Sequence, residues 1–234
     1  MTFLLALFLP VCSGASDSLA VLNFFVGEVQ VRNDDRGPWR KAELGQKLSR
    51  GDWVRTGKES RAELLLPDSS VVRLGERTIF QLRSLKGTKR STRLLRGRLW
   101  NNIRKLKAEY EVASPTAIAA IRGTVFRLTV LPDSTTTVWV YKGQVGVRPP
   151  PKPPWTRPGP RREVEGPREV PPPVHEVGVE RWRKIVAEIL VREREMMTVR
   201  RDGSAEKRPF SPEEEVEEWV RWNRERDKIL GLSR

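Results

Sequence analysis

The residues that could support catalysis are few and far apart in this sequence. The only histidine, His175, lies in a proline-rich stretch, and the only cysteine, Cys12, lies in an apolar stretch near the N-terminus. A Ser-His-Asp or Cys-His catalytic site and a Cys/His zinc site each need such residues on folded elements. The acids Asp52, Asp68 and Asp133 each follow Gly or Pro, where Asp bonds the backbone of a turn. We therefore predict a non-enzymatic protein without a metal or other cofactor.

A block of basic residues is the strongest chemical signal in the chain. Residues 77–108 contain eleven Lys and Arg and no acidic residue. Such a block can form an anion-binding face for phosphate and carboxylate groups. The alternative is a solvated strand edge, where basic side chains prevent edge-to-edge pairing. The candidate anion-binding residues are Lys86, Lys89, Arg90, Arg93, Arg96, Arg98, Arg104, Lys105 and Lys107.

The positive charge is concentrated in the first two thirds of the chain. The net charge is +14, and residues 19–148 contain 25 Lys and Arg against 12 Asp and Glu, whereas residues 176–234 contain 14 of each. This distribution favours anionic partners such as cell-wall or outer-membrane polymers. Nucleic acid is disfavoured as a partner, because few aromatic residues that could stack on bases interleave the basic block.

Short apolar runs separated by turn residues must position these charges. Residues 53–56, 61–66 and 71–74 form such runs, and turns at residues 57–60 and 67–70 separate them. Strands at this regular spacing are typical of an all-β module. Further strands are predicted at residues 19–31, at 78–82, at 94–103 as a strand pair or a bulged strand around Gly97, at 119–131, and in a final hairpin of residues 135–140 and 144–147.

Three motifs in this region resemble the FecR domain of bacterial envelope proteins. The first motif is Gly-Asp followed by Thr and an Asp-containing turn, the second is Arg-Gly-Thr followed by an aromatic residue, and the third is Gly between alternating valines. The matching residues are Gly51, Asp52, Thr56 and Asp68, then Arg122, Gly123, Thr124 and Phe126, and finally Gly143. These residue types also have structural roles, since Gly permits unusual φ angles and Asp bonds within turns.

The resemblance extends over residues 27–147 and implies a compact all-β module. We expect a mainly β fold at residues 19–148, built as a β-sandwich or as a β-helix-like stack. Period-two alternation would place four valines on one face, towards a core: Val138, Val140, Val145 and Val147. The resemblance identifies a module and does not identify a ligand.

Residues 1–18 are predicted to be a secretory signal peptide. The apolar run at residues 3–11 precedes three small residues, and it is too short to span a bilayer. The sequence LPVC also allows lipidation at Cys12. We therefore expect an exported protein of the periplasm or cell envelope, which contacts a membrane only through a lipid on Cys12 or through peripheral charge.

The C-terminal third of the chain differs in composition from the β module. Residues 149–175 are predicted to be a proline-rich linker, because eleven of them are proline. Residues 176–234 are expected to form a helical tail of two helices, which docks on the β module or on a partner. The first helix is predicted at residues 179–197 from apolar residues at helical spacing. The second begins with Ser211 and Glu214 in a capping-box arrangement.

Three functions are compatible with these features. The leading one is a non-enzymatic exported module that binds or acts as a scaffold in the cell envelope, with an envelope protein or an anionic cell-wall or outer-membrane polymer as its partner. The second follows from the resemblance, because some FecR-like proteins regulate sigma factors from the inner membrane, and the chain would then be a periplasmic signal-sensing component. The third is a binder of anionic polymers through the basic face of residues 77–107.

Overall fold

A computed structural model describes residues 20–84, 89–104, 109–150, 188–211, 214 and 217–232. The predicted signal peptide with Cys12, and the predicted linker beyond residue 150, lie outside these ranges. Within them the chain is mainly β, with two packed layers of strands and the helix α3 (Glu218–Ile229). No helix in this part of the chain is long and apolar enough to cross a membrane.

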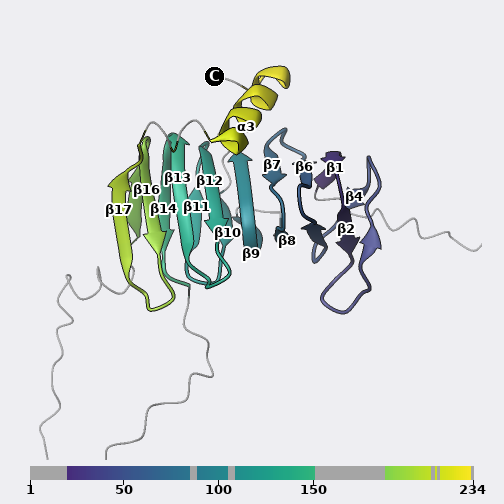
Figure 1. The fold of residues 1–234 in the computed structure, drawn as a ribbon, viewed down its shortest axis with the longest axis horizontal. Helices are drawn as coiled ribbons and strands as arrows, with labels where there is room; N and C mark the ends of the chain where they lie inside the picture. Colours follow the sequence, from purple (N-terminus) through teal and green to yellow (C-terminus); the bar gives the residue numbers. More distant parts are fainter. Residues whose placement is uncertain are drawn as a thin grey trace, which may run out of the picture.

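The two layers share one long strand, β9 (Lys89–Asn102). The strands follow one another across the molecule, from β17 (Ala205–Pro209) on the left to β2 (Val29–Arg32) and β4 (Lys47–Leu48) on the right of Figure 1. Layer A contains, in order of pairing, β4 (Lys47–Leu48), β1 (Ala20–Val26), β6 (Arg61–Leu65), β7 (Val71–Leu74), the second half of β9, β12 (Val125–Val130), β13 (Thr136–Lys142), β16 (Glu195–Val199) and β17 (Ala205–Pro209). Every pair in this layer is antiparallel.

Layer B lies against layer A and has a matching order of strands. It contains, in order of pairing, β3 (Arg40–Lys41), β2 (Val29–Arg32), β5 (Trp53–Thr56), β8 (Ile79–Ser84), the first half of β9, β10 (Glu109–Ala113), β11 (Ile118–Ile121), β14 (Gln144–Arg148) and β15 (Ile189–Arg192). These pairs are antiparallel except β9 with β10, which is parallel. In both layers the strand order largely follows the chain, so successive segments of the sequence add strands to one layer and then to the other.

Strand β9 takes part in both layers because it bends near Gly97. Residues before the bend pair with β8 and β10, and residues after it pair with β7 and β12. The φ angle of Gly97 is +96°, in the region that favours glycine. The register also shifts between Ile79 and Phe80 of β8, which leaves Leu95 as an extra residue in β9. Of the two predicted arrangements around Gly97, the bulged strand is therefore confirmed.

One hydrophobic core fills the space between the layers. It is built from residues that alternate along each strand, such as Leu64 on β6, Phe80 on β8 and Leu128 on β12, all of them fully buried. The four valines predicted to face a core are at most 1% exposed. The predicted all-β module is confirmed, and of the two predicted builds the structure is a sandwich.

The predicted final hairpin is wrong. Strands β13 and β14 are consecutive in the chain, but β13 pairs with β12 and β16 in layer A, whereas β14 pairs with β11 and β15 in layer B. Gly143, with a φ of +84°, lies at the turn that carries the chain between the layers. Alternating valines suit two strands that face each other across a core as well as they suit a hairpin, so the pattern could not separate the two.

The predicted first tail helix is wrong over residues 188–197, the part that the structure describes. Residues 189–209 contribute β15, β16 and β17, which extend the two layers beyond β14 and β13. Val191, Met197 and Val199 are buried in the common core. The edges of β13 and β14 provide backbone hydrogen-bond partners for this segment, and such tertiary pairing overrides a local helical pattern.

The two hydrogen bonds of the predicted capping box are present, but they do not cap α3, which begins later than predicted. The Ser211 N–H donates to Glu214 Oε2 at 2.8 Å, and the Glu214 N–H donates to Ser211 Oγ at 3.4 Å. Helix α3 begins at Glu218, after Glu217, whose side chain makes no capping hydrogen bond. The helix packs on the outer face of layer A, so the docking predicted for the tail is confirmed for α3.

Candidate functional site

The Gly-Asp pair of the first motif holds a turn in front of β5. Gly51 has a φ of +94°, and the Asp52 carboxylate accepts a hydrogen bond from the Ser49 N–H at 2.7 Å. Burial raises the pKa of the Asp52 carboxyl, against the lowering effect of the Ser49 hydrogen bond. The hydrogen bond of the Asp52 carboxylate is local, so it supports a turn and not a ligand site.

Thr56 and Asp68, the other members of the first motif, also bond within the sandwich. Thr56 Oγ1 donates to the carbonyl oxygen of Gly75 at 2.6 Å. The Asp68 carboxylate accepts from the Ser70 N–H at 2.8 Å and pairs with Arg90. One of the predicted anion-binding residues, Arg90, is thus engaged by an acid of the protein itself.

The Arg-Gly-Thr motif lies in the connection between β11 and β12. Arg122 is exposed, Gly123 has a φ of +67°, and Thr124 Oγ1 donates to the carbonyl oxygen of Gln144 at 2.9 Å. Phe126 is fully buried in the core. The motif therefore anchors the start of β12 to β14 and leaves the Arg122 side chain at the surface.

The structure describes the side chains of five of the predicted anion-binding residues, Arg90, Arg93, Arg96, Arg98 and Arg104, and these five make separate contacts. Burial lowers the pKa of the Arg93 guanidinium, and the charge of Arg83 lowers it further. Arg96 and Arg98 flank the bend of β9 and line a groove in layer A, whereas Arg104 lines a separate pocket beside α3. Lys86, Lys105 and Lys107 lie outside the residues that the structure describes, as does the side chain of Lys89.

A buried ion-pair network joins α3 to the outer face of layer A. The side chains of Glu63 on β6 and Arg73 on β7 are 0% exposed. Arg73 Nε donates to Glu63 Oε2 at 2.7 Å, and Arg73 Nη1 donates to Asp227 Oδ1 at 2.6 Å. Arg226 Nε donates to Glu63 Oε2 at 2.9 Å, and Trp100 Nε1 donates to Asp227 Oδ2 at 3.1 Å. Two residues of α3 are therefore bonded to three strands.

This network holds Glu63 in its ionised form. Burial opposes ionisation, but hydrogen bonds from Arg226, Arg73 and Asn23 outweigh it and lower the pKa of Glu63 to about 2. The Asn23 bond, from Nδ2 to Glu63 Oε1, is 2.9 Å long. Removing either partner of such a pair leaves an uncompensated buried charge, which costs about 3–5 kcal/mol.

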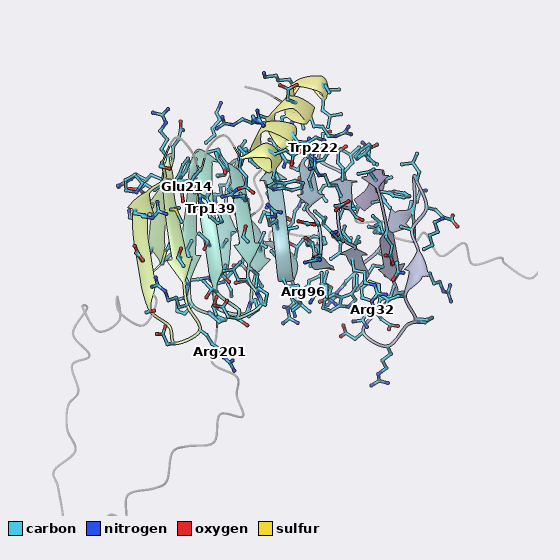
Figure 2. All side chains as sticks on the ribbon, in the orientation of Figure 1. Arg32, Arg96, Trp139, Arg201, Glu214 and Trp222 are labelled. Carbon is cyan, nitrogen blue, oxygen red and sulfur yellow. The ribbon has the colours of Figure 1, made fainter. Side chains whose placement is uncertain are left out.

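Aromatic side chains fill the rest of the interface under α3. Trp219 and Trp222 of the helix stack with ring centroids 5.3 Å apart, and Trp222 lies 6.3 Å from Phe24 of β1. The ring centroids of Trp100 on β9 and Tyr141 on β13 are 4.8 Å apart. Trp222 lies at the base of α3, near the upper ends of the strands (Figure 2). The helix is thus held by both polar and aromatic contacts.

The sequence pattern does not indicate this interface. Glu63 and Arg73 alternate with apolar residues in their strands, a pattern that indicates solvent-facing charges. The available signal was the pair Arg226 and Asp227 near the end of a predicted helix, which matches Glu63 and Arg73 in opposite charge. Sequence alone could not show that these four side chains meet.

A pocket of 460 Å³, the helix-end pocket, opens beside the C-terminal half of α3. Trp100 and Tyr141 form an aromatic wall, and Asn102, only 7% exposed, lines the pocket with an Nδ2 atom that has no hydrogen-bond partner among the described residues. Its other lining residues are Ile103, Arg104, Gly123, Thr124, Val125, Lys142, Arg224, Asp227, Lys228, Gly231 and Leu232. The pocket therefore joins Arg104 of the basic block to the Arg-Gly-Thr motif, and its chemistry suits binding through aromatic and cationic groups.

The family model of the FecR protein matches residues 52–146. Two crystal structures of a candidate anti-sigma factor from Parabacteroides distasonis ATCC 8503, at 1.65 and 2.50 Å resolution, are similar to this chain. Each shares 16% sequence identity with it at a TM-score of 0.48, covers 67% of this chain, and is itself covered over 59% of its length. No curated protein matches the sequence.

Proposed function

We propose that this chain, which carries a FecR domain at residues 52–146, is a non-enzymatic binding module of the bacterial cell envelope. The family match is the observation that supports this function most directly. It begins just before β5, ends within β14 and includes the Arg-Gly-Thr motif. Helix α3 lies outside the match and adds a second wall to the helix-end pocket.

The surface around the end of α3 supports a binding role. Ile229 is 76% exposed and Leu230 is 38% exposed, next to a pocket with an aromatic wall and several cations. Exposed apolar side chains rimmed by charge are typical of protein-protein contact sites. Among the residues that the structure describes, no group of three or more His, Cys, Asp or Glu could hold a metal ion.

A signal-sensing role is the second candidate function, and the FecR match favours it. In that role the bound partner is the signal, and the chain is a periplasmic component related to FecR sigma-factor regulators. The ionic attachment of α3 would allow a partner to compete for the outer face of layer A. A scaffold and a sensor therefore share the binding step and differ in its consequence for transcription.

Site-specific photocross-linking in living cells tests the binding function. A benzophenone amino acid at Ile229 lies beside the helix-end pocket, and the same group at Leu44, which is 70% exposed and lies before β4, is the matched control. We expect the full chain to be exported and to form a discrete adduct with an envelope component from position 229 and none from position 44.

Retention of the protein in the cytoplasm, or equal labelling at both positions, would contradict the proposal. Deleting the gene separates the two candidate functions. Altered expression of genes under an extracytoplasmic sigma factor supports a sensor, whereas unchanged expression of those genes supports a scaffold.

A further inference from the structure

A second hollow in layer A lies where β9, β12 and β13 approach the start of α3. We call it the arginine groove, because Arg77, Arg96, Arg98 and Arg127 line it. Its volume is 740 Å³, and it holds two acids, Glu76 and Glu217, against these four cations. Arg96 lies beside the bend of β9, at the lower edge of the molecule in Figure 2. The groove therefore carries a net positive charge.

The chain already places one carboxylate in this groove. Glu217 Oε1 accepts from Arg98 Nη1 at 2.6 Å, and Glu217 Oε2 accepts from Arg127 Nη1 at 2.5 Å. Glu217 precedes α3 in the N-cap position, yet its side chain makes no capping hydrogen bond to the helix. The side chain is 41% exposed, so one face of this carboxylate remains open to solvent.

Arg127 has more donor capacity than Glu217 uses. Its side chain is 5% exposed, and its guanidinium lies 3.8 Å from the ring centroid of Trp139. Its Nε atom is buried and has no hydrogen-bond partner among the described residues. A buried guanidinium costs free energy unless its donors are paired, so a further acceptor oxygen at Arg127 would be stabilising.

The rest of the groove supplies further cations and an apolar wall. Arg77 and Arg96 are exposed and form no ion pair within the described part of the chain. Leu131, which is 48% exposed, and Pro132 lie on the apolar side with Trp139. A ligand that fits would carry two or more carboxylates beside an apolar group.

We propose that the arginine groove is the docking site for an acidic peptide segment of a partner protein, and that Glu217 is an intramolecular occupant that the partner displaces. The chain's own sequence at residues 213–218, EEEVEE, has the composition that the groove selects. A planar guanidinium pair recognises carboxylates with fixed geometry. The occupant seen in the structure is itself a peptide carboxylate, and this favours a peptide over a phosphate polymer.

This proposal names the partner class of the proposed binding function and rests on that function. The test uses purified full-length protein and a fluorescent synthetic peptide, EEEVEEW, which is the sequence of residues 213–219. Glu217→Gln should bind the peptide about two- to fivefold more tightly than the parent does, because the competing carboxylate is removed. The matched control is Glu225→Gln, which makes the same charge change at an exposed position of the same helix and should leave the affinity unchanged.

A second variant keeps the test valid if Glu217→Gln proves unstable. Arg96→Gln removes an exposed cation and should weaken peptide binding about two- to fivefold with little change in melting temperature. Arg40→Gln, at an exposed position on β3 of layer B, should have no effect. Equal affinities of the Glu217 and Glu225 variants, or equal binding of the peptide QQQVQQW, would overturn the proposal.

Tighter binding of inorganic polyphosphate than of the peptide, at equal concentration of negative charge, would also overturn it and assign the groove to phosphate polymers. Failure in this purified system leaves the cross-linking result at Ile229 unaffected. The two proposals can therefore fail separately.

Discussion

Glu63 and Arg73 illustrate how strand charges that a sequence pattern assigns to solvent can become fully buried. Each lies on the outer face of layer A, and α3 brings Arg226 and Asp227 over them. The helix and the sheet exclude solvent from these charged side chains. The desolvation cost is offset only because Glu63 and Arg73 are each bonded to several partners. Arg73 Nη2 is still without a partner among the described residues, so the offset is incomplete.

Lowering the pH should weaken the attachment of α3 through Glu63. Its folded-state pKa of about 2 lies below the usual 4.5, so the ionised carboxylate contributes stability that is fully present above about pH 4.5 and is lost as the pH falls towards 2. The contribution at neutral pH is on the order of 3 kcal/mol. We expect the melting temperature of the parent, followed by tryptophan fluorescence, to fall more steeply across this window than that of Glu63→Gln. Parallel curves would show that Glu63 is not the responsible group.

At the scale of elements, β9 determines how the two layers are joined. It pairs with strands of both layers on either side of Gly97. A Cβ atom at Gly97 would lie 2.3 Å from Thr78 Oγ1 and 2.5 Å from Thr78 Cα. Since a backbone atom cannot move aside as a flexible side chain does, this position requires glycine for its contacts as well as for its φ angle.

Gly97→Ala should therefore destabilise the sandwich more than an ordinary glycine substitution. We expect the free energy of unfolding to fall by about 3 kcal/mol or more, from backbone strain and steric clash together. The matched control is Gly203→Ala, where φ is +86° but no atom lies within 4 Å of the added Cβ. It should cost about 1–2 kcal/mol. Equal losses for the two variants in urea unfolding would refute the steric part of the argument.

Strands β15, β16 and β17 also depend on pairing with strands that lie far away in the sequence. Strand β16 pairs with β13, and β15 pairs with β14, so each extends a layer that would otherwise end at an open edge. Strand β17 then becomes the edge of layer A, and its five residues, which include Lys207, Arg208 and Pro209, are all exposed. Charged residues and proline on an edge strand prevent further pairing.

At the scale of the whole molecule, residues on both sides of the proline-rich stretch form one sandwich. The core includes Val191, Met197 and Val199 together with residues of the segment that matches the FecR family model. Helix α3 adds the Glu63–Arg73–Asp227 network. The predicted boundary at residue 148 therefore separates segments of sequence that pack together in space.

Cutting the chain within this stretch should leave the two pieces associated. A specific protease site inserted after Pro160 lies between β14 and β15 in sequence. We expect the nicked protein to elute as one species in size-exclusion chromatography and to separate into two fragments only in denaturant, because sheet pairing, the core and α3 connect them. An N-terminal fragment that elutes alone with a β-type circular dichroism spectrum would instead establish a domain boundary at residue 148.

The sequence by itself determined the features that depend on neighbouring residues. The strands at residues 53–56 and 71–74, the bulge around Gly97, the inward valines and the capping box at Ser211 follow from turn chemistry and side-chain alternation. The match to the FecR protein agrees with motifs of the same local kind.

Only the tertiary structure decided which segments meet. The period of apolar residues at 188–197 allowed a helix, and the free edges of β13 and β14 made strands instead. The valines of β13 and β14 suited a hairpin, yet they face each other across the core. The described basic residues are close in sequence but make separate contacts, since Arg90 pairs with Asp68, Arg98 pairs with Glu217, and Arg104 lines the helix-end pocket. Pairing and burial depend on residues far away in the chain, and a local pattern contains no information about them.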